Sequence, residues 1–228
     1  MRFIEDGPDI PIKLLDARDK GEVVFICGAG VSIPAGLPSF SSLTKQVLND
    51  LGVSDTDYIQ KLYDQAASAG PNDFPPPYDH IFSHLKREFG DTKVERSVFR
   101  RLRKPRAANV DYHRAILALS ANVSGGPRVI TTNFDLLFEN AQSKLRTYVS
   151  PELPDFRAID DFEGVVYLHG RLSGNRQATT IANPVILSSS DFGRAYLSQG
   201  WAARFVRELL QRYTVSVVKC NGSRHRLN

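Results

Sequence analysis

Residues 23–36, VVFICGAGVSIPAG, decide the fold class of this chain. The first five residues form a continuous apolar run, rich in β-branched side chains, that ends at Gly28. Such a run is typical of a strand buried on both faces of a parallel sheet. The glycines that follow allow a tight turn and a close approach of the backbone to a ligand. We therefore expect a strand, a glycine-rich turn and then a helix.

Apolar runs and amphipathic patterns alternate along the rest of the chain. Strands are predicted at 128–132, 165–169 and 214–218, and helices at 10–19, 43–52, 56–68, 78–90, 110–120, 135–145 and 201–213. This alternation predicts an α/β fold, a Rossmann-like doubly wound and mostly parallel sheet. The helical stretch at about 41–120, which contains a proline-rich loop at 69–77, is predicted to be an insertion beside the sheet. The sequence shows no reliable domain boundary, so we expect one domain over residues 1–228.

Composition limits the class of protein further. The chain has 228 residues, 42% hydrophobic and 24% charged, enough for one large α/β domain and too apolar for a disordered chain. Cys27 and Cys220 are the only cysteines, which excludes a disulfide scaffold and a four-cysteine zinc site. No apolar run reaches the roughly 18–20 residues of a membrane span, and MRFIEDGPDI does not resemble a secretory leader. We expect a cytoplasmic protein that does not contact a membrane.

The net charge of +4 is concentrated in two short segments. Residues 100–106, RRLRKPR, carry five positive charges, and the last ten residues carry three, which leaves the remainder at −4. A pI raised by two short patches is weak support for a polyanion-binding face. We therefore favour a solvated helix end and a basic tail over contact with nucleic acid.

The turn after the first strand is the first candidate site. Successive backbone N–H groups at Gly28, Ala29 and Gly30 can form a cradle for an anion, and the Ser32 hydroxyl can add a donor. The dinucleotide fingerprint G-x-G-x-x-G is not satisfied, because position 33 is isoleucine. A tight turn with no ligand explains the glycines equally well.

Polar side chains follow the second predicted strand. Thr132, Asn133 and Asp135 lie at its carboxyl end, where open parallel sheets bind ligands. The alternative is structural, because Thr132 or Asn133 could cap a helix beginning at Asp135.

His169 directly follows an apolar run and is placed to act as a general base. A single histidine is more often structural. His113 and His225 have no comparable placement, and His80 and His84, four apart on a predicted helix, lack partners for a metal site.

The three segments together resemble the Sir2 family, the sirtuins and their bacterial relatives. Residues 28–40, GAGVSIPAGLPSF, resemble the nucleotide loop of that family; 132–135, TNFD, its T-x-N-x-D segment; and His169-Gly170 its catalytic pair. All three occur in the family's order, each after a predicted strand. The resemblance covers most of the chain and implies NAD⁺ as the ligand.

Departures from the protein-deacylating sirtuins favour another branch of the family. The cysteine-rich zinc ribbon is absent, because no cysteine lies between positions 27 and 220. Ser39 and Ser41 also stand where the deacylases have the acidic and basic residues of G-I-P-D-F-R. This pattern is similar to SIR2-like domains of bacterial antiphage defence proteins, which cleave NAD⁺ and are usually joined to sensing or effector domains.

The resemblance implies a role for each matching residue in an NAD⁺ hydrolase. Asn133 would orient the ribose and the attacking water, and His169 would accept a proton. No zinc is expected. The remaining positions would bind NAD⁺, which is the substrate in this reaction: Gly28, Ala29, Gly30 and Ser32 at the pyrophosphate, Asp135 at the nicotinamide, Pro38 and Phe40 as an apolar wall, and Thr132 beside them.

Other functions stay open at the sequence level. One is NAD⁺-dependent transfer to an acceptor, either protein deacylation or ADP-ribosylation. Another is a non-catalytic module that senses NAD⁺ or ADP-ribose, which the polar segment KCNGSRHRLN at 219–228 favours, because relatives carry a ribose-binding glycine-serine turn there. Gly222-Ser223 could replace that turn, and the chain is expected to be altered or truncated after about 218. A second copy of the chain or a defence-system protein is the expected partner.

Overall fold

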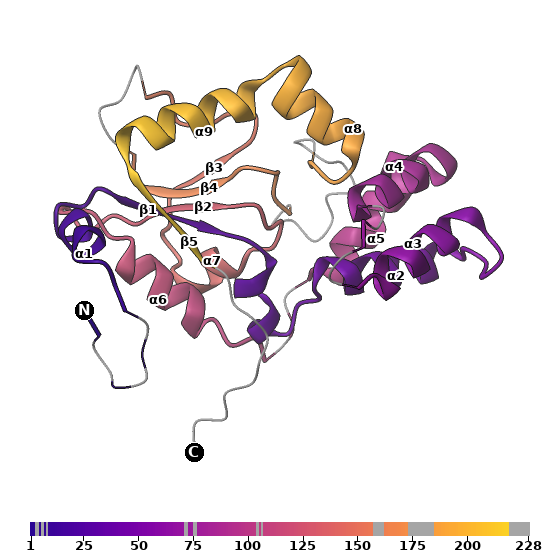
Figure 1. Cartoon of the computed structure of the whole chain (residues 1–228), viewed down its shortest axis with the longest axis horizontal. Helices are drawn as coiled ribbons and strands as arrows, with labels where there is room; N and C mark the ends of the chain where they lie inside the picture. Colours follow the sequence, from indigo (N-terminus) through magenta and orange to yellow (C-terminus); the bar gives the residue numbers. More distant parts are fainter. Residues whose placement is uncertain are drawn as a thin grey trace.

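The computed structural model describes residues 1–2, 5, 7, 9–70, 73–74, 77–103, 105, 107–156, 162–172 and 185–218. Its centre is a five-stranded sheet in the order β3-β4-β2-β1-β5, with every neighbouring pair parallel (Figure 1). The strands are β1 (Val23–Cys27), β2 (Arg128–Thr131), β3 (Thr147–Val149), β4 (Gly164–Tyr167) and β5 (Thr214–Val218). The predicted α/β class with a parallel sheet is confirmed.

Both faces of the sheet are covered, as the continuous apolar runs require. On one face, Val24, Ile130 and Val166 pack with Phe205 and Leu209 of α9 (Trp201–Arg212). The neighbouring strand residues point to the opposite face, where the covering helices are α6 (Asp111–Leu119) and α7 (Leu137–Ala141). Figure 1 shows α9 on one side of the sheet and α6 and α7 on the other.

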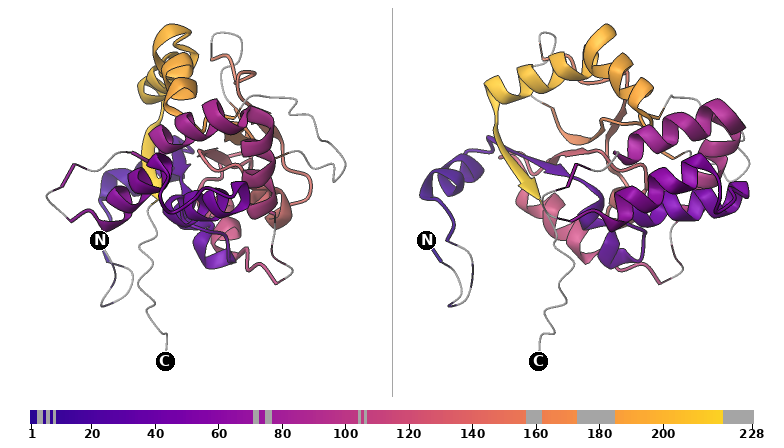
Figure 2. Two further views of the ribbon diagram at one scale, coloured as in Figure 1. Left: turned by 90° about the vertical axis from the view of Figure 1, so that its right-hand side faces the viewer. Right: turned by 45° about the vertical axis from the view of Figure 1, so that its right-hand side comes forward.

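Four helices between β1 and α6 form a layer of their own, which we call the cap. They are α2 (Phe40–Leu51), α3 (Tyr58–Ser68), α4 (Tyr78–Phe89) and α5 (Asp91–Arg101). Their buried side chains, including Val47, Ile81 and Val98, make one hydrophobic cluster. Figures 1 and 2 show the cap helices grouped beyond the carboxyl end of the strands. Helix α6, at the end of the predicted insertion, packs on the sheet through Ile116 and Leu117.

Other elements differ from the sequence-based prediction. Strand β3 and helix α5 were not predicted, nor were α8 (Ser189–Phe192) and the π-helix Gly193–Ser198 that continues it. Strand β4 ends at Tyr167, so His169 lies in the turn after the strand.

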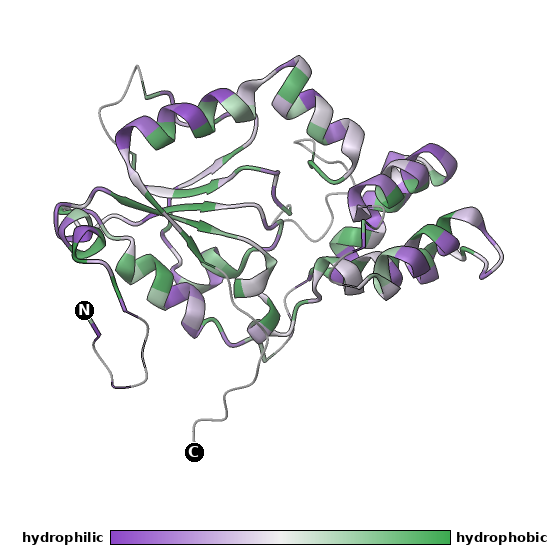
Figure 3. Cartoon of the chain, in the orientation of Figure 1, coloured by the Kyte–Doolittle hydropathy of each residue, from purple (hydrophilic) through white to green (hydrophobic). Residues whose placement is uncertain are grey.

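Helix α1 (Ile12–Asp19) packs beside β1. Figure 3 shows the apolar strands between helices that turn their polar faces outward. Among the described residues, none of the helices has the length and hydropathy to cross a membrane.

Candidate functional site

The strand register brings the three predicted segments to one edge of the sheet. Cys27 of β1 is level with Thr131 of β2, and Thr131 is level with Tyr167 of β4. Because the three strands are adjacent and parallel, the residues after them emerge side by side. The backbone N–H of Thr132 donates to the Cys27 carbonyl at 3.0 Å, which ties the polar segment to the start of the glycine turn.

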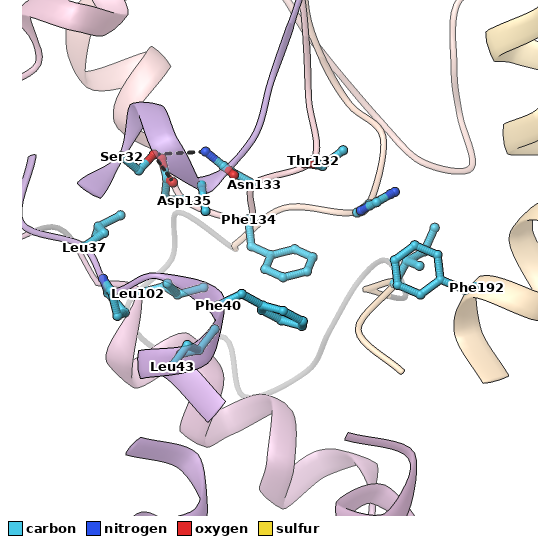
Figure 4. Close-up of a pocket in the computed structure, with 14 residues that line it drawn as sticks. Ser32, Leu37, Phe40, Leu43, Leu102, Thr132, Asn133, Phe134, Asp135 and Phe192 are labelled. Atoms are coloured by element: carbon cyan, nitrogen blue, oxygen red, sulfur yellow. Dashed lines mark hydrogen bonds between the residues drawn. The ribbon is translucent and has the colours of Figure 1, made fainter. Parts of the chain in front are cut away.

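A cavity of about 250 Å³ lies at this edge, between the strand ends and the cap. Eight of the ten predicted site residues line it: Ala29, Ser32, Pro38, Phe40, Thr132, Asn133, Asp135 and His169. Gly28 and Gly30 are not among the lining residues. Six apolar residues complete the wall: Leu37, Leu43, Leu102, Phe134, Ile186 and Phe192. Figure 4 shows Phe40, Phe134 and Phe192 around the cavity, with the polar groups Ser32, Asn133 and Asp135 gathered on one side.

Asn133 joins the second segment to the first. Its side-chain nitrogen donates to the Gly28 carbonyl and to Ser32 Oγ, both at 3.0 Å. Because the Gly28 carbonyl can only accept, this contact fixes which end of the amide is the nitrogen. Within the described residues, Oδ1 of Asn133 makes no hydrogen bond. The amide thus retains an acceptor for a ligand.

Asp135 is 4% exposed and bonds to the same serine. Ser32 Oγ donates to its Oδ2 at 2.8 Å, and the backbone N–H of Leu137 donates to its Oδ1 at 3.0 Å. Burial raises the pKa of Asp135, and these two hydrogen bonds oppose that rise. Helix α7 begins at Leu137, and its N-cap residue, Leu136, makes no side-chain capping bond. Asp135 accepts from the first amide of this helix, and Asn133 is directed to the glycine turn.

His113 is a member of this cluster that the sequence analysis did not single out. It is fully buried on α6, with Nε2 3.5 Å from Ser32 Oγ and its ring edge-on to Phe138. Burial lowers the pKa of His113 to about 4, so the imidazole is neutral at pH 7. Its Nδ1 has no hydrogen-bond partner among the described residues. Its spacing on α6 matches the apolar face of the helix, and only the fold brings it to Ser32.

His169 also lines the cavity. It is 9% exposed, and burial lowers the pKa of its side chain to about 4. A neutral imidazole at pH 7 can accept a proton, which the charged form cannot. Its ring meets that of Phe192 edge-on, with the centroids 5.1 Å apart. The backbone is fixed as well, because the His169 carbonyl accepts from the N–H of Ile186 at 2.9 Å.

His84 and the basic segment have local partners. His84 on α4 contacts the Tyr58 ring, and its Nδ1 lies 2.9 Å from Arg87. Searched over the described residues, the chain brings no three His, Cys, Asp or Glu side chains together as a metal site. In the basic segment, Arg101 pairs with Asp50 of α2. Lys104, Arg106 and residues 219–228, with Gly222-Ser223, lie outside the described residues.

The fold and this cavity define a parallel α/β domain with a candidate ligand site at the carboxyl ends of its central strands. Residues 127–226 match the family described as the SIR2-like domain. The chain is also 35% identical over 226 residues to "Uncharacterized protein y4cA" of Sinorhizobium fredii (strain NBRC 101917 / NGR234). That alignment covers 96% of this chain and 18% of the relative. Residues 127–226 thus carry a SIR2-like domain, a type of domain that points to a family of NAD-dependent enzymes. The chain spans about a fifth of the length of the curated relative it matches.

Proposed function

We propose that this domain hydrolyses NAD⁺ at the bond between nicotinamide and ribose. The observation that carries the proposal is the convergence of a glycine turn, the Asn133 amide and the neutral His169 imidazole on one cavity. A family match over residues 127–226 supports NAD⁺ as the small molecule. We further propose that the reaction serves antiphage defence in bacteria, on the resemblance to defence proteins.

The chemistry of the cavity fits the two ends of this substrate. Phe40, Leu102 and Phe192 offer apolar surface to the flat nicotinamide ring, and the polar cluster around Asn133 lies beside them. The short 3₁₀ turn Ala29–Val31 leaves its first amides without an acceptor inside the turn. These amides and Gly28 would face the pyrophosphate, next to Ser32 and Thr132.

The reaction needs a base and no general acid. When the C1′–N bond breaks, its electron pair goes to the ring nitrogen and nicotinamide leaves as a neutral molecule. A water oxygen then bonds to C1′ of the ribose, and the proton that it loses passes to His169. The products are nicotinamide and ADP-ribose. Because burial lowers the pKa of His169 to about 4, the imidazole is neutral at pH 7 and has a lone pair for this proton.

Asn133 would position the other participants. Its nitrogen is held by Gly28 and Ser32, so its free Oδ1 can accept a hydrogen bond from the water or from a ribose hydroxyl. Asp135 would act on the nicotinamide side through the same cluster. Holding reactants in this way is a large part of the catalysis available to a site without an acid.

The test is nicotinamide release from NAD⁺ by the purified chain. His169→Ala and Asn133→Ala should each lower the rate by about a hundredfold or more, because a positioned base contributes about 10²–10⁴-fold. His84→Ala, which removes a histidine from the cap surface, is the matched control and should keep the wild-type rate.

Three results would contradict the proposal. Release that requires an acylated peptide or another acceptor would identify a transferase or deacylase. Binding of NAD⁺ in a calorimeter with no release would identify a sensing module. Full activity in both variants would remove His169 and Asn133 from the mechanism.

A further inference from the structure

The nitrogen Nε2 of His169 has a hydrogen-bond partner that the family resemblance does not supply. It lies 2.9 Å from the hydroxyl oxygen of Tyr196. Tyr196 belongs to the π-helix Gly193–Ser198, which continues α8. Phe192, at the end of α8, lines the cavity. Turns of π-helix are uncommon and are frequently found at functional sites.

Aromatic packing fixes this pair from a second side. Phe192 and Tyr196 stack with their centroids 5.9 Å apart, and both rings meet the His169 imidazole edge-on. The histidine thus contacts two stacked rings, one from α8 and one from the π-helix that continues it. This geometry limits rotation of the imidazole about its side-chain bonds, so each ring nitrogen keeps a defined direction.

The two nitrogens of His169 therefore have different surroundings. Nε2 bonds to Tyr196, whereas Nδ1 has no hydrogen-bond partner within the described residues. A neutral imidazole carries one proton, on one nitrogen or the other. If Tyr196 donated to Nε2, the proton would lie on Nδ1 and no lone pair would remain to accept another. If Nε2–H donates to Tyr196, the lone pair of Nδ1 remains free.

We propose that Tyr196 is a positioning residue for His169: its hydroxyl oxygen accepts from Nε2–H and so leaves Nδ1 as the proton acceptor of the site. The identity of the proton donor, the attacking water, rests on the proposed function. The choice of tautomer rests on it as well, because His169 must keep a lone pair to accept that proton, but the tautomer itself is measured in the free protein. Tyr196 itself keeps its proton, because burial raises the pKa of the phenol. Because the Tyr196 side chain is only partly buried, its hydroxyl proton can point away from His169.

The first test reads the tautomer directly by ¹⁵N NMR of the whole chain with labelled histidine. His169→Gln identifies the resonances. We expect wild-type His169 to carry its proton on Nε2 at pH 7, and Tyr196→Phe to shift the population toward Nδ1–H. The matched control is Tyr148→Phe, because the Tyr148 hydroxyl is buried and has no hydrogen-bond partner in the part of the chain that the structure describes. That variant should leave the His169 signals unchanged.

The second test is nicotinamide release by the same proteins. Tyr196→Phe should lower kcat by at least about tenfold and change KM less than about twofold, since a wrong tautomer impairs the base and not binding. Tyr148→Phe should match the wild type. Absence of release by the wild type would overturn the proposed function alone.

The proposal about Tyr196 has its own failing outcomes. A proton on Nδ1 in the wild-type protein would overturn it, even if Tyr196→Phe did not fold. An unchanged tautomer in a folded Tyr196→Phe variant would overturn it equally.

Discussion

His113 and His169 are buried, and burial lowers the pKa of each to about 4, against 6.5 for an unperturbed histidine. Between these two pH values, the unfolded chain binds protons that the folded chain does not. The free energy of unfolding therefore falls as the pH is lowered from 7 toward 4, and rises again as the pH is raised.

The size of this effect can be tested on His113. We expect wild-type stability to fall by about 2 kcal/mol per buried histidine between pH 7 and pH 5. His113→Gln should remove one such contribution, so its stability should depend less on pH. The measurement is urea unfolding of both proteins at the two pH values.

Asp135 contributes with the opposite sign, since burial raises its pKa, but it is present in both proteins and cancels from the difference. Equal losses of stability in wild type and variant would mean that His113 titrates normally in the folded chain.

At the scale of single residues, the sequence predicts what lies directly after a strand and little else. Asn133 and His169 follow apolar runs, so their placement at the sheet edge was predictable, and they line one cavity. His113 and Tyr196 reach the cluster from α6 and from a π-helix. Their contacts join positions 81 and 27 residues apart, which no local pattern encodes.

Among the elements, helix α8 connects the cap to the candidate site. Lys86 of α4 lies 2.8 Å from Asp191 of α8 and 3.1 Å from Glu95 of α5, and all three side chains are largely buried. Asp191 also accepts from the backbone N–H of Ser188 at 3.0 Å, at the start of α8. The lysine thus holds two carboxylates and one helix end in place.

Removing that lysine should destabilise the chain strongly. Lys86→Met leaves two buried carboxylates without their counter-charge, a change that costs about 3–5 kcal/mol in buried ion pairs. The matched control is Arg87→Met on the exposed face of the same helix, where the expected change is within about 0.5 kcal/mol.

Urea unfolding of the two variants measures the difference. Adding Glu95→Gln to Lys86→Met should restore part of the loss, because it removes one of the unpaired charges. Equal stability of Lys86→Met and Arg87→Met would show that the buried ion cluster does not stabilise the chain.

The elements that sequence predicts well are the long and strongly patterned ones. Strands β1 and β5 and helix α9 match their predicted bounds to within a residue. Strand β3 has three partly buried residues, too few for a pattern. Helix α5, DTKVERSVFRR, is so charged that it merges with the basic segment after it, and tertiary packing of Val94 and Val98 stabilises it.

For the whole molecule, strand order determines the position of the site. Strands β4, β2 and β1 lie next to each other although they are far apart in the chain, so three separate turns meet at one edge. The cap supplies the remaining wall through α2 and the end of α5, and α8 supplies Phe192. A ligand in this cavity would contact both layers at once.

This arrangement predicts a distinctive pattern of hydrogen exchange. A ligand at 100 times its Kd stabilises the folded protein by about 2.7 kcal/mol. Backbone amides that can exchange only after the ligand has dissociated should therefore exchange about a hundredfold more slowly. ADP-ribose should protect the turns after β1, β2 and β4. NAD⁺, added to the inactive His169→Ala variant, should also protect the amides near Phe40, Leu102 and Phe192, because only NAD⁺ carries the nicotinamide ring. Helix α3, which lines no part of the cavity, is the internal control. If both ligands protected the same segments, the apolar wall would not be the nicotinamide site. If neither ligand protected the cap helices, the ligand would contact the sheet layer alone.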